Sequence, residues 1–506
     1  MAVDLSKPGL TVAVFGAGTM GSGIAQVCAQ AGIATLLFDP RDGAVNTALA
    51  SIDKGLAGQV AKGRMTEEAR RDVMRRLKPM TSVNEASAAG LAIEAIVEDL
   101  GAKRDLFRSL ESCMAADAII VTNTSSLSVT EIAAGCERPD RIGGLHFFNP
   151  PPVMKLVEVI AGLRSAPGLA DALEAFTRRI GKTPIVATDT PGFVVNHAGR
   201  AYGPEALRIA GQGTATPREI DQLMKEAAGF RMGPFELLDL VGGDVTHAVM
   251  ESIYGRYYDE PMYQPSAMMA ARVAGGLLGR KSKRGFYDYA EAPAAGEPTI
   301  VVEESEKPAS VWIAKEDGGD ELAAMLESAG IKCQRGGPPG PDALCLVTPL
   351  GEDCTAAVLR LKLNPAHTVA VDMFGRFKGR MTAMKNPLTS PASLAAAVAA
   401  LAATGAPVTA INDSTGFVVQ RLIAMIVNVG TRIAELRVAA PADIDTAVEL
   451  GLNYPKGPLA LGNSLGAVRV LKILDSMFAL THDPKYRATA WLRRRAALGV
   501  SLHTPD

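Results

Sequence analysis

The chain has 506 residues, of which 48% are apolar and 21% are charged, and its formal net charge is only −2. This length predicts three or four domains, and the near balance of 52 basic and 54 acidic residues excludes a broad basic surface for nucleic acid. Because its apolar runs are too short to span a bilayer and its six scattered cysteines lack metal-ligand spacing, we expect a cytoplasmic protein with no membrane partner and no metal site.

The first predicted elements form a nucleotide-binding unit. Residues 11–15 predict a strand, which is followed by three spaced glycines and a helix of small residues. Gly16 would permit a tight turn, Gly18 would let the backbone approach a pyrophosphate, and Gly21 would let the helix lie close to the sheet. The N-terminus of the helix would then face the anion.

Asp39 ends the second predicted strand, residues 34–38. A carboxylate at this place accepts hydrogen bonds from the adenosine ribose hydroxyls and repels a 2′-phosphate, which favours NAD over NADP. Arg41 weakens that preference slightly, and Asp39-Pro40 also fits a simple turn. With the whole unit in view, the cofactor that we expect is NAD.

Residues 10–187 alternate between strand and helix patterns. The predicted strands are residues 11–15, 34–38, 91–97, 118–122, 142–147, 156–160 and 184–187. Such alternation predicts a mostly parallel sheet with helices on both faces. Residues 42–78 predict a protruding pair of helices, and the pattern is helical from residue 192 to about residue 279.

An internal repeat organises the rest of the chain. With a constant offset of 224 positions, Asp189-Thr190-Pro191-Gly192-Phe193-Val194-Val195-Asn196 recurs as Asp413-Ser414-Thr415-Gly416-Phe417-Val418-Val419-Gln420. We therefore expect a duplicated helical domain.

Between the two copies, strand and helix patterns alternate again. Strands are expected at residues 299–303, 311–314, 343–348 and 368–372, and helices at 321–329, 355–363 and 393–403. No glycine fingerprint follows the first of these strands, so this smaller unit is expected to bind no dinucleotide. Residues 380–387 look like a decayed echo of residues 141–150 without the histidine, which predicts one active site per chain.

The predicted fold is an α/β Rossmann-type N-terminal domain followed by an all-α domain, a degenerate α/β domain and a second all-α domain. The expected boundaries are 1–188, 189–290, 298–411 and 412–506.

One stretch has the composition of a buried proton-transfer site. Glu158 lies twelve residues after the histidine of Gly144-Leu145-His146-Phe147-Phe148-Asn149-Pro150. Imidazole can take a proton from an alcohol near neutral pH, while a carboxylate fixes its tautomer. The pattern alone also fits a hydrogen-bonded core histidine. Its place after a complete dinucleotide unit and before Asn196 favours a base with its orienting acid.

Six motifs, in this order, resemble the NAD-dependent 3-hydroxyacyl-CoA dehydrogenases over residues 8–290. Besides the glycines and Asp39, they are Glu94-Ala95-Ile96-Val97-Glu98, Thr122-Asn123-Thr124-Ser125-Ser126, His146-Phe147-Phe148-Asn149-Pro150 with Glu158, and Pro191-Gly192-Phe193-Val194-Val195-Asn196. The duplicated helical domain further resembles the long bacterial form, which includes 3-hydroxyadipyl-CoA dehydrogenases of phenylacetate breakdown. The resemblance implies oxidation of 3-hydroxyacyl-CoA to 3-oxoacyl-CoA with NAD, in fatty-acid or aromatic catabolism.

The resemblance also implies roles for single residues. His146 would be the general base, Glu158 would orient it, and Ser125 and Asn196 would hydrogen-bond the substrate oxygen. The implied cofactor contacts are Gly16, Gly18, Thr19, Met20, Gly21, Asp39, Glu98, Lys103, Ser125, Asn149 and Lys281. The cations implied to meet the phosphates of CoA are Lys54, Lys62 and Arg64.

These residues also have ordinary explanations. Ser125 fits a helix cap, Asn149 fits a turn before Pro150, and the charged side chains fit a solvated surface. His197 and Arg200 stand where many single-copy relatives differ, and we hypothesise that one of them receives the distal carboxylate of a dicarboxylyl-CoA.

We expect a homodimer or another homo-oligomer. In single-copy relatives the helical domains pair between subunits, so the extra copy is expected to serve packing by replacing or remodelling that pairing.

Two other functions stay open at this point. An NAD-dependent dehydrogenase of a hydroxy acid without CoA would share the glycines and the fold, but it does not predict His146 with Glu158. A non-catalytic dinucleotide-binding structural protein would not require Ser125 and Asn196 in addition to that pair.

Overall fold

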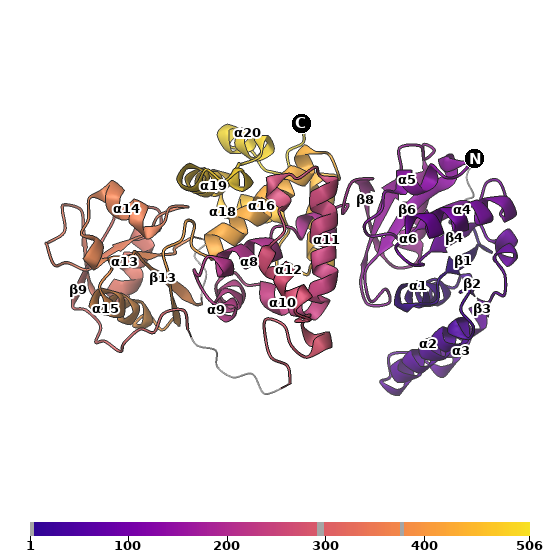
Figure 1. Ribbon diagram of the computed structural model, residues 1–506, viewed down its shortest axis with the longest axis horizontal. Helices are drawn as coiled ribbons and strands as arrows, with labels where there is room; N and C mark the ends of the chain where they lie inside the picture. Colours follow the sequence, from indigo (N-terminus) through magenta and orange to yellow (C-terminus); the bar gives the residue numbers. More distant parts are fainter. Residues whose placement is uncertain (1–4, 291–297, 375–378) are drawn as a thin grey trace. The chain divides into compact units, whose positions relative to one another are not determined.

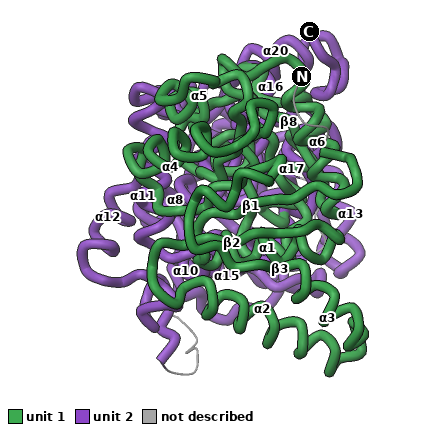
Figure 2. Tube along the Cα trace, turned by 90° about the vertical axis from the view of Figure 1, so that its right-hand side faces the viewer, with its two compact units in different colours: residues 1–197, 436–453 green, residues 198–435, 454–506 purple. Residues whose placement is uncertain are grey.

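The computed structural model describes residues 5–290, 298–374 and 379–506. They gather into two compact units, each of which contains one β-sheet (Figure 1). The first unit comprises the chain up to His197 together with Leu436–Asn453, and the second comprises Ala198–Glu435 and Tyr454–Asp506 (Figure 2). The first unit therefore includes one segment that is distant from the rest of it in sequence.

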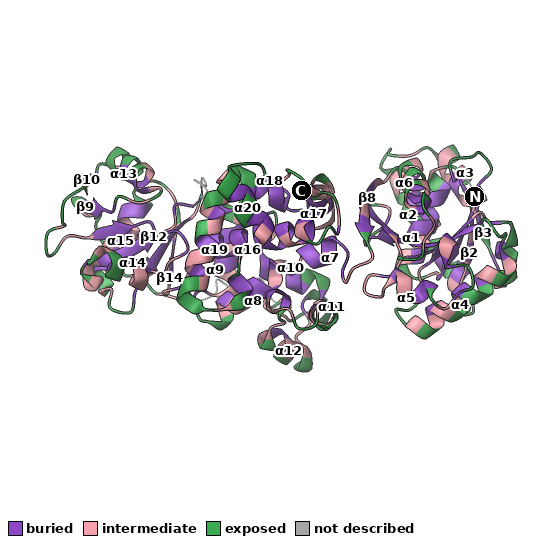
Figure 3. Ribbon diagram, turned by 90° about the horizontal axis from the view of Figure 1, so that it is seen from above, coloured by how far each residue is buried: buried purple, intermediate pink, exposed green. Residues whose placement is uncertain are grey.

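The sheet of the first unit is mostly parallel, as predicted. Its order is β3 (Leu77–Pro79), β2 (Ala34–Phe38), β1 (Thr11–Phe15), β4 (Leu91–Glu94), β5 (Ile119–Thr122), β6 (Ile142–Phe147), β7 (Leu156–Ala161) and β8 (Thr183–Thr188). Only β6 and β7 pair antiparallel. The edge strand β3 was not predicted. Nearly all residues of the central strands are buried, and Figure 3 colours the buried residues of the molecule purple.

Helices cover both faces of this sheet. They are α1 (Thr19–Gln30), α4 (Leu100–Cys113), α5 (Val129–Ala133) and α6 (Leu169–Arg179), and α2 (Ala44–Ala61) with α3 (Glu67–Arg76) forms the predicted helix pair. Side chains alternate along β1, so Val12 and Val14 pack with α1 and α6, whereas Ala13 and Phe15 pack with α4 and α5. The sheet thus lies between two hydrophobic cores, one on each of its faces.

The second unit contains a smaller sheet. Its order is β10 (Lys332–Arg335), β9 (Ser310–Ile313), β11 (Cys345–Val347), β12 (Thr368–Val371), β13 (Met381–Lys385) and β14 (Val408–Ile411), with β12 and β13 antiparallel. Its helices are α13 (Gly319–Ser328), α14 (Cys354–Leu361) and α15 (Pro391–Ala402). The α/β unit expected between the repeats is therefore present.

Two details of that prediction are wrong. Residues 299–303 form no strand, because the Thr299 N–H donates to Glu219 Oε1 (3.0 Å) instead of to a neighbouring strand. Residues 380–387 include β13, which pairs with β14 as β7 pairs with β8, so they correspond to the Glu158 strand and not to the His146 strand.

The repeated helical segments follow each sheet. The first has α7 (Val195–Ala198), α8 (Gly203–Gly211), α9 (Pro217–Gln222), η3 (Leu223–Ala227), α10 (Pro234–Val241), α11 (Gly243–Arg256) and α12 (Ala267–Ala274). The second has α16 (Val419–Glu435), α17 (Pro441–Gly451), α18 (Pro458–Leu465), α19 (Ala467–Thr481) and α20 (Ala490–Leu498).

Each sheet also receives a segment of the other repeat. In the first unit α17 packs on β7 and β8, and the Thr188 N–H donates to Val438 O (2.8 Å). In the second unit η3 packs on β13, and the Asn412 N–H donates to Thr214 O (3.0 Å). Both residues of one pair are displaced by 224 positions from those of the other. The exchange is therefore reciprocal.

Candidate active site

The turn after β1 has the geometry of a dinucleotide site. Gly16 has φ +101°, and a Cβ on it would lie 2.4 Å from Ala95 O. A Cβ on Gly21 would lie 1.8 Å from Gly16 O, so only glycine allows α1 to begin this close to the strand. Gly18 is exposed, and nothing lies within 4 Å of the place of its Cβ. Because the first turn of α1, which begins with Thr19 and Met20, contains no acidic residue, its N–H groups suit a pyrophosphate.

Asp39 lies beside this turn, just after β2. Its Oδ2 accepts a hydrogen bond from Ala17 N (2.8 Å), and Arg41 pairs with both of its oxygens, at 2.9 and 2.8 Å. The Arg41 guanidinium holds the pKa of Asp39 well below its usual range. The carboxylate is therefore charged at neutral pH, and its contact with a ribose diol stays a prediction.

His146 and Glu158 face each other across the antiparallel pair of β6 and β7. His146 Nδ1 lies 2.6 Å from Glu158 Oε2, and both side chains are buried, with exposed fractions of 7% and 0%. The other oxygen, Glu158 Oε1, accepts from the N–H groups of Val194 and Val195, each at 2.9 Å. An ionised carboxylate can only accept a hydrogen bond, so this contact favours the tautomer in which Nδ1 carries the proton and Nε2 has the free lone pair.

Ser125 lies in the loop after β5, and Glu98 holds that loop in place. Glu98 Oε1 accepts from Ser125 N (2.9 Å), Ser126 N (3.0 Å) and the Thr124 hydroxyl (2.6 Å). Burial alone would raise the pKa of Glu98, but Lys103 and these donors outweigh it and lower the pKa to about 2. The loop is therefore fixed by a permanent charge.

Lys103 is buried, with an exposed fraction of 1%. Its Nζ lies 2.5 Å from Glu94 Oε1 and 3.2 Å from Glu98 Oε2, while Glu94 Oε2 accepts from the Thr122 hydroxyl (2.7 Å). This network joins the ends of β4 and β5 to the Ser125 loop. A direct contact of Lys103 with the cofactor stays a prediction, since the ammonium is already bound to two carboxylates.

Three asparagines lie near the ends of these strands. Asn196 Nδ2 lies 3.5 Å from Ser125 O, so the two residues expected at the substrate oxygen are neighbours. Asn149 is exposed just after β6. Asn123 Oδ1 accepts from Phe147 N (2.8 Å) and ties the end of β5 to that of β6. The role of Asn123 was not foreseen, although it lies within a motif that the sequence singled out.

Two aromatic rings around the histidine were also missed. The ring centroids of Phe148 and Phe193 lie 4.5 and 5.7 Å from that of His146. Phe148 is next but one to the histidine in sequence, whereas Phe193 comes from the start of the helical repeat. Both rings limit the movement of the imidazole and make its surroundings apolar.

The expected cations differ in their surroundings. Lys54 on α2 and Lys62 and Arg64 just after it are all exposed, as a CoA phosphate would require. Lys281 lies in the second unit, where its ammonium pairs with Asp244. Its contact with the cofactor stays a prediction.

His197 and Arg200 have exposed fractions of 0% and 7%. Burial of both side chains does not favour the hypothesis that one of them receives a distal carboxylate, and it stays a prediction.

Comparison with known proteins identifies the family. The model of the 3-hydroxyacyl-CoA dehydrogenase NAD-binding domain matches residues 11–190, and that of the C-terminal domain matches residues 192–289 and again residues 416–501. This chain belongs to the 3-hydroxyacyl-CoA dehydrogenase family. The second match of the C-terminal domain confirms the duplicated helical repeat.

Individual relatives agree with this assignment. The chain is 38% identical over 488 residues to 3-hydroxyadipyl-CoA dehydrogenase of Escherichia coli, covering 96% of this chain and 98% of that protein. It is 41% identical over 280 residues to 3-hydroxybutyryl-CoA dehydrogenase of Clostridioides difficile, covering 55% and 99%. The crystal structure of 3-hydroxybutyryl-CoA dehydrogenase from E. coli K12 superimposes with a TM-score of 0.86 at 35% identity, covering 97% and 99%.

The chain is thus an NAD-dependent oxidoreductase that acts on the CH–OH group of 3-hydroxyacyl-CoA. The glycine turn, the free start of α1 and the charged Asp39 fit NAD. In the described parts of the chain, no helix is long and apolar enough to cross a bilayer. Membership of this family favours a 3-hydroxyacyl-CoA dehydrogenase over the two alternatives, a dehydrogenase of a hydroxy acid without CoA and a non-catalytic dinucleotide-binding protein.

Proposed function

We propose that His146 is the general base in the oxidation of 3-hydroxyacyl-CoA to 3-oxoacyl-CoA and that Glu158 is its positioning residue. The 2.6 Å contact between His146 Nδ1 and Glu158 Oε2 carries this proposal, because it leaves Nε2 as the nitrogen that takes the proton of the 3-hydroxyl group. When bound, NAD accepts the hydride that leaves C3. The C3–O bond becomes a carbonyl as the O–H and C3–H bonds break.

Glu158 is suited to this task because its other contacts are already fixed. The Val194 and Val195 N–H groups hold one carboxylate oxygen, so the second stays directed at His146. The negative charge stabilises the imidazolium that forms when the base is protonated. In the reverse direction, that imidazolium would return its proton to the alkoxide.

Ser125 and Asn196 are proposed to hydrogen-bond the substrate oxygen. Their support is mutual proximity, since Asn196 Nδ2 lies 3.5 Å from Ser125 O, and rigidity, since Glu98 fixes the backbone of Ser125. Donors placed in advance stabilise a developing alkoxide more than they stabilise the neutral alcohol.

The recognition of CoA and the metabolic setting are also proposals. Lys54, Lys62 and Arg64 would meet its phosphates, because they form an exposed group of cations in a chain of nearly zero net charge. The names of the E. coli relatives support 3-hydroxybutyryl-CoA or 3-hydroxyadipyl-CoA as the substrate. Fatty-acid or phenylacetate catabolism in the cytoplasm is the setting that we propose from the sequence resemblance alone.

The test is the rate of NADH formation, followed by absorbance, with a panel of 3-hydroxyacyl-CoAs from butyryl to adipyl. Wild-type protein should oxidise at least one of them, and Glu158→Gln should lower kcat about 10²-fold while KM for NAD changes little. A shift in the pH profile of kcat should accompany this loss, because Gln does not stabilise the imidazolium. Full activity of Glu158→Gln, or no activity of the wild type on any thioester, would overturn the proposal.

A further inference from the structure

The sheet of the second unit has an acidic residue at the place of the catalytic histidine. In the first unit His146 is opposite Glu158, which is opposite Ile185 on β8. In the second unit the Asp372 N–H donates to Thr382 O (3.2 Å), and Thr382 is opposite Thr409 on β14. Thr409 follows Ile185 by the same 224 positions as the sequence repeat, so Asp372 corresponds to His146 and Thr382 to Glu158.

The residue that corresponds to Asn196 also turns toward this place. Gln420 is completely buried, and its Nε2 donates to Asp372 Oδ1 (3.0 Å). The N–H of Phe374 donates to the same oxygen (3.0 Å). In contrast, Asp372 Oδ2 is shielded from solvent and has no hydrogen-bond partner among the described residues. Burial raises the pKa of Asp372 to about 6, so the group is mostly ionised at neutral pH.

Asp372 lines a cavity of about 650 Å³ that lies within the second unit. This size is typical of sites for small organic molecules. Most of the cavity wall is apolar, and its large side chains are Met325, Met373, Phe374, Met381 and Val419. Methionine side chains adapt readily to ligands of different shape.

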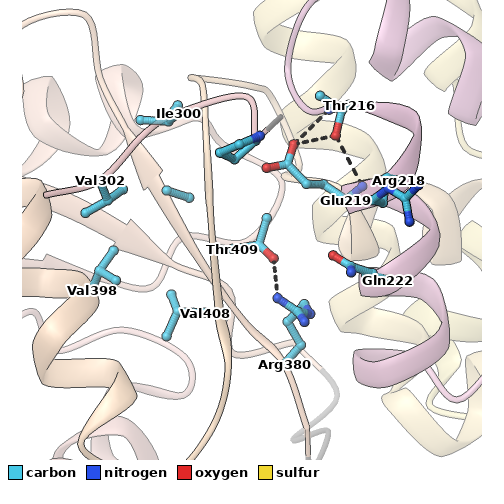
Figure 4. Close-up of a pocket in the computed structure, with 12 residues that line it drawn as sticks. Thr216, Arg218, Glu219, Gln222, Ile300, Val302, Arg380, Val398, Val408 and Thr409 are labelled. Atoms are coloured by element: carbon cyan, nitrogen blue, oxygen red, sulfur yellow. Dashed lines mark hydrogen bonds between the residues drawn. The ribbon is translucent and has the colours of Figure 1, made fainter. Parts of the chain in front are cut away.

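The charges around the cavity favour a cation. Asp372 lines it with an oxygen that has no hydrogen-bond partner among the described residues, and the only described cation in its wall, Arg380, is already engaged. Arg380 Nε donates to Glu226 Oε2 (3.1 Å). Its Nη1 donates to the Thr409 hydroxyl (3.1 Å), which Figure 4 shows in the smaller neighbouring cavity. An anionic acyl-CoA or dinucleotide would find no free positive charge among these residues.

We propose that this cavity binds a small organic ammonium ion, with the ammonium at Asp372 and an apolar body against the methionines. The ligand would satisfy the carboxylate oxygen that the described residues leave without a partner. The second unit would then carry a binding site of its own instead of a silent copy of the catalytic centre. This proposal does not depend on the catalytic roles of His146 and Glu158.

Isothermal titration of the full-length chain with three probes of similar shape tests the proposal. These are phenethylammonium, 2-phenylethanol and phenylacetate. Phenethylammonium should bind at least about tenfold more tightly than the alcohol, because a charged hydrogen bond is the stronger one, and phenylacetate should not bind. Equal binding of all three probes, or no binding of the ammonium, would overturn the proposal.

Variants then locate the site. Asp372→Asn should weaken the binding of phenethylammonium about tenfold, whereas Asp342→Asn, which changes an exposed carboxylate of the same unit, should not. If Asp372→Asn does not melt cooperatively, Ala324→Phe carries the test, because Ala324 is an exposed residue of the cavity wall and the larger ring should block it. Wild-type affinity in Ala324→Phe or in a folded Asp372→Asn would place the probe elsewhere and overturn the proposal.

Discussion

The two units place different chemistry on the same pairing of strands. In the first, an antiparallel pair of strands brings His146 to Glu158, and the backbone N–H groups of Val194 and Val195 donate hydrogen bonds to the other oxygen of that carboxylate. In the second, the corresponding pair brings Asp372 to Thr382 and Gln420. The backbone pattern is the same, while an aspartate stands in place of the histidine. The same pairing of strands can therefore present either an imidazole or a carboxylate, and the side chain decides what the place can bind or do.

The two units also differ at the start of the helix that follows the first strand of each sheet. Helix α1 begins after glycines and has no acidic residue in its first turn. Helix α13, which follows the corresponding strand β9, has Asp320 and Glu321 in its first turn. Those carboxylates oppose a phosphate where the helix N-terminus would otherwise attract one. The second unit thus lacks both halves of a dehydrogenase site among its described residues.

The largest effect is expected when the first unit is made to resemble the second. His146→Asp should lower kcat about 10²–10⁴-fold, because a carboxylate of ordinary pKa is a weak base for an alcohol. NADH formation measures the loss, and NAD binding serves as the control for folding. Adding Asp372→His to this variant should restore no activity, since the described residues of the second unit contain no glycine turn like the one after β1. Restored turnover in the double variant would contradict the comparison.

The next prediction concerns stability and asks whether the second repeat supports the first. Glu205 on α8 is completely buried, and Arg421 and Lys485 of the second repeat lie 2.5 and 3.2 Å from its oxygens. Glu205→Ala should lower the free energy of unfolding by about 3–5 kcal/mol, because it leaves two buried cations without their partner. Thermal melting measures this. Glu251→Ala, which removes a mostly exposed carboxylate, should change it by less than about 0.5 kcal/mol.

The same carboxylate predicts an acid dependence. Burial raises the pKa of Glu205, but Arg421 and Lys485 outweigh this and lower it to about 2, from an ordinary value of 4.5. Its contribution to stability is therefore complete above pH 4.5 and is lost as the pH falls toward 2. Melting temperatures of the wild type should fall more steeply below pH 4.5 than those of Glu205→Gln. Parallel curves would show that Glu205 titrates normally.

The smallest effect is expected at the surface. Changing Lys54, Lys62 and Arg64 together to Ala should raise KM for the CoA substrate about threefold at low salt, and less at high salt, because exposed charges are screened. Turnover of the matching pantetheine thioester, which lacks the phosphates, should not change. An equal rise of KM for both thioesters would argue against a role in phosphate recognition.

Much of the first unit follows from local sequence. The glycine turn, the position of Asp39 and the His146 motif each have a physical requirement that is met within a few residues, and the constant offset of 224 exposes the repeat. The short strands β3, β10, β13 and β14 were not predicted, since three to five residues carry little periodic signal. Edge pairing and register, which depend on distant partners, decide such strands.

The roles of Lys103 and Asp372 could not be predicted for the same reason. Lys103 looks like a surface residue in sequence, yet it is buried between Glu94 and Glu98, which lie nine and five residues earlier. Asp372 is in no recognisable motif, and its relation to His146 emerges only from the pairing of β12 with β13. Such correspondences need the three-dimensional register.

The reciprocal exchange of α17 and η3 constrains how this chain can change over evolutionary time. Strand β7, which carries Glu158, is covered by α17, a helix of the second repeat that lies almost 300 residues later in the chain. A stop codon or deletion in the later half would strip that cover from the catalytic sheet. Because each sheet is covered by a segment of the other repeat, loss of either half would expose apolar residues of the half that remains. Retention of the second half therefore needs no second catalytic activity. The cavity at Asp372 could change its ligand without loss of this structural role.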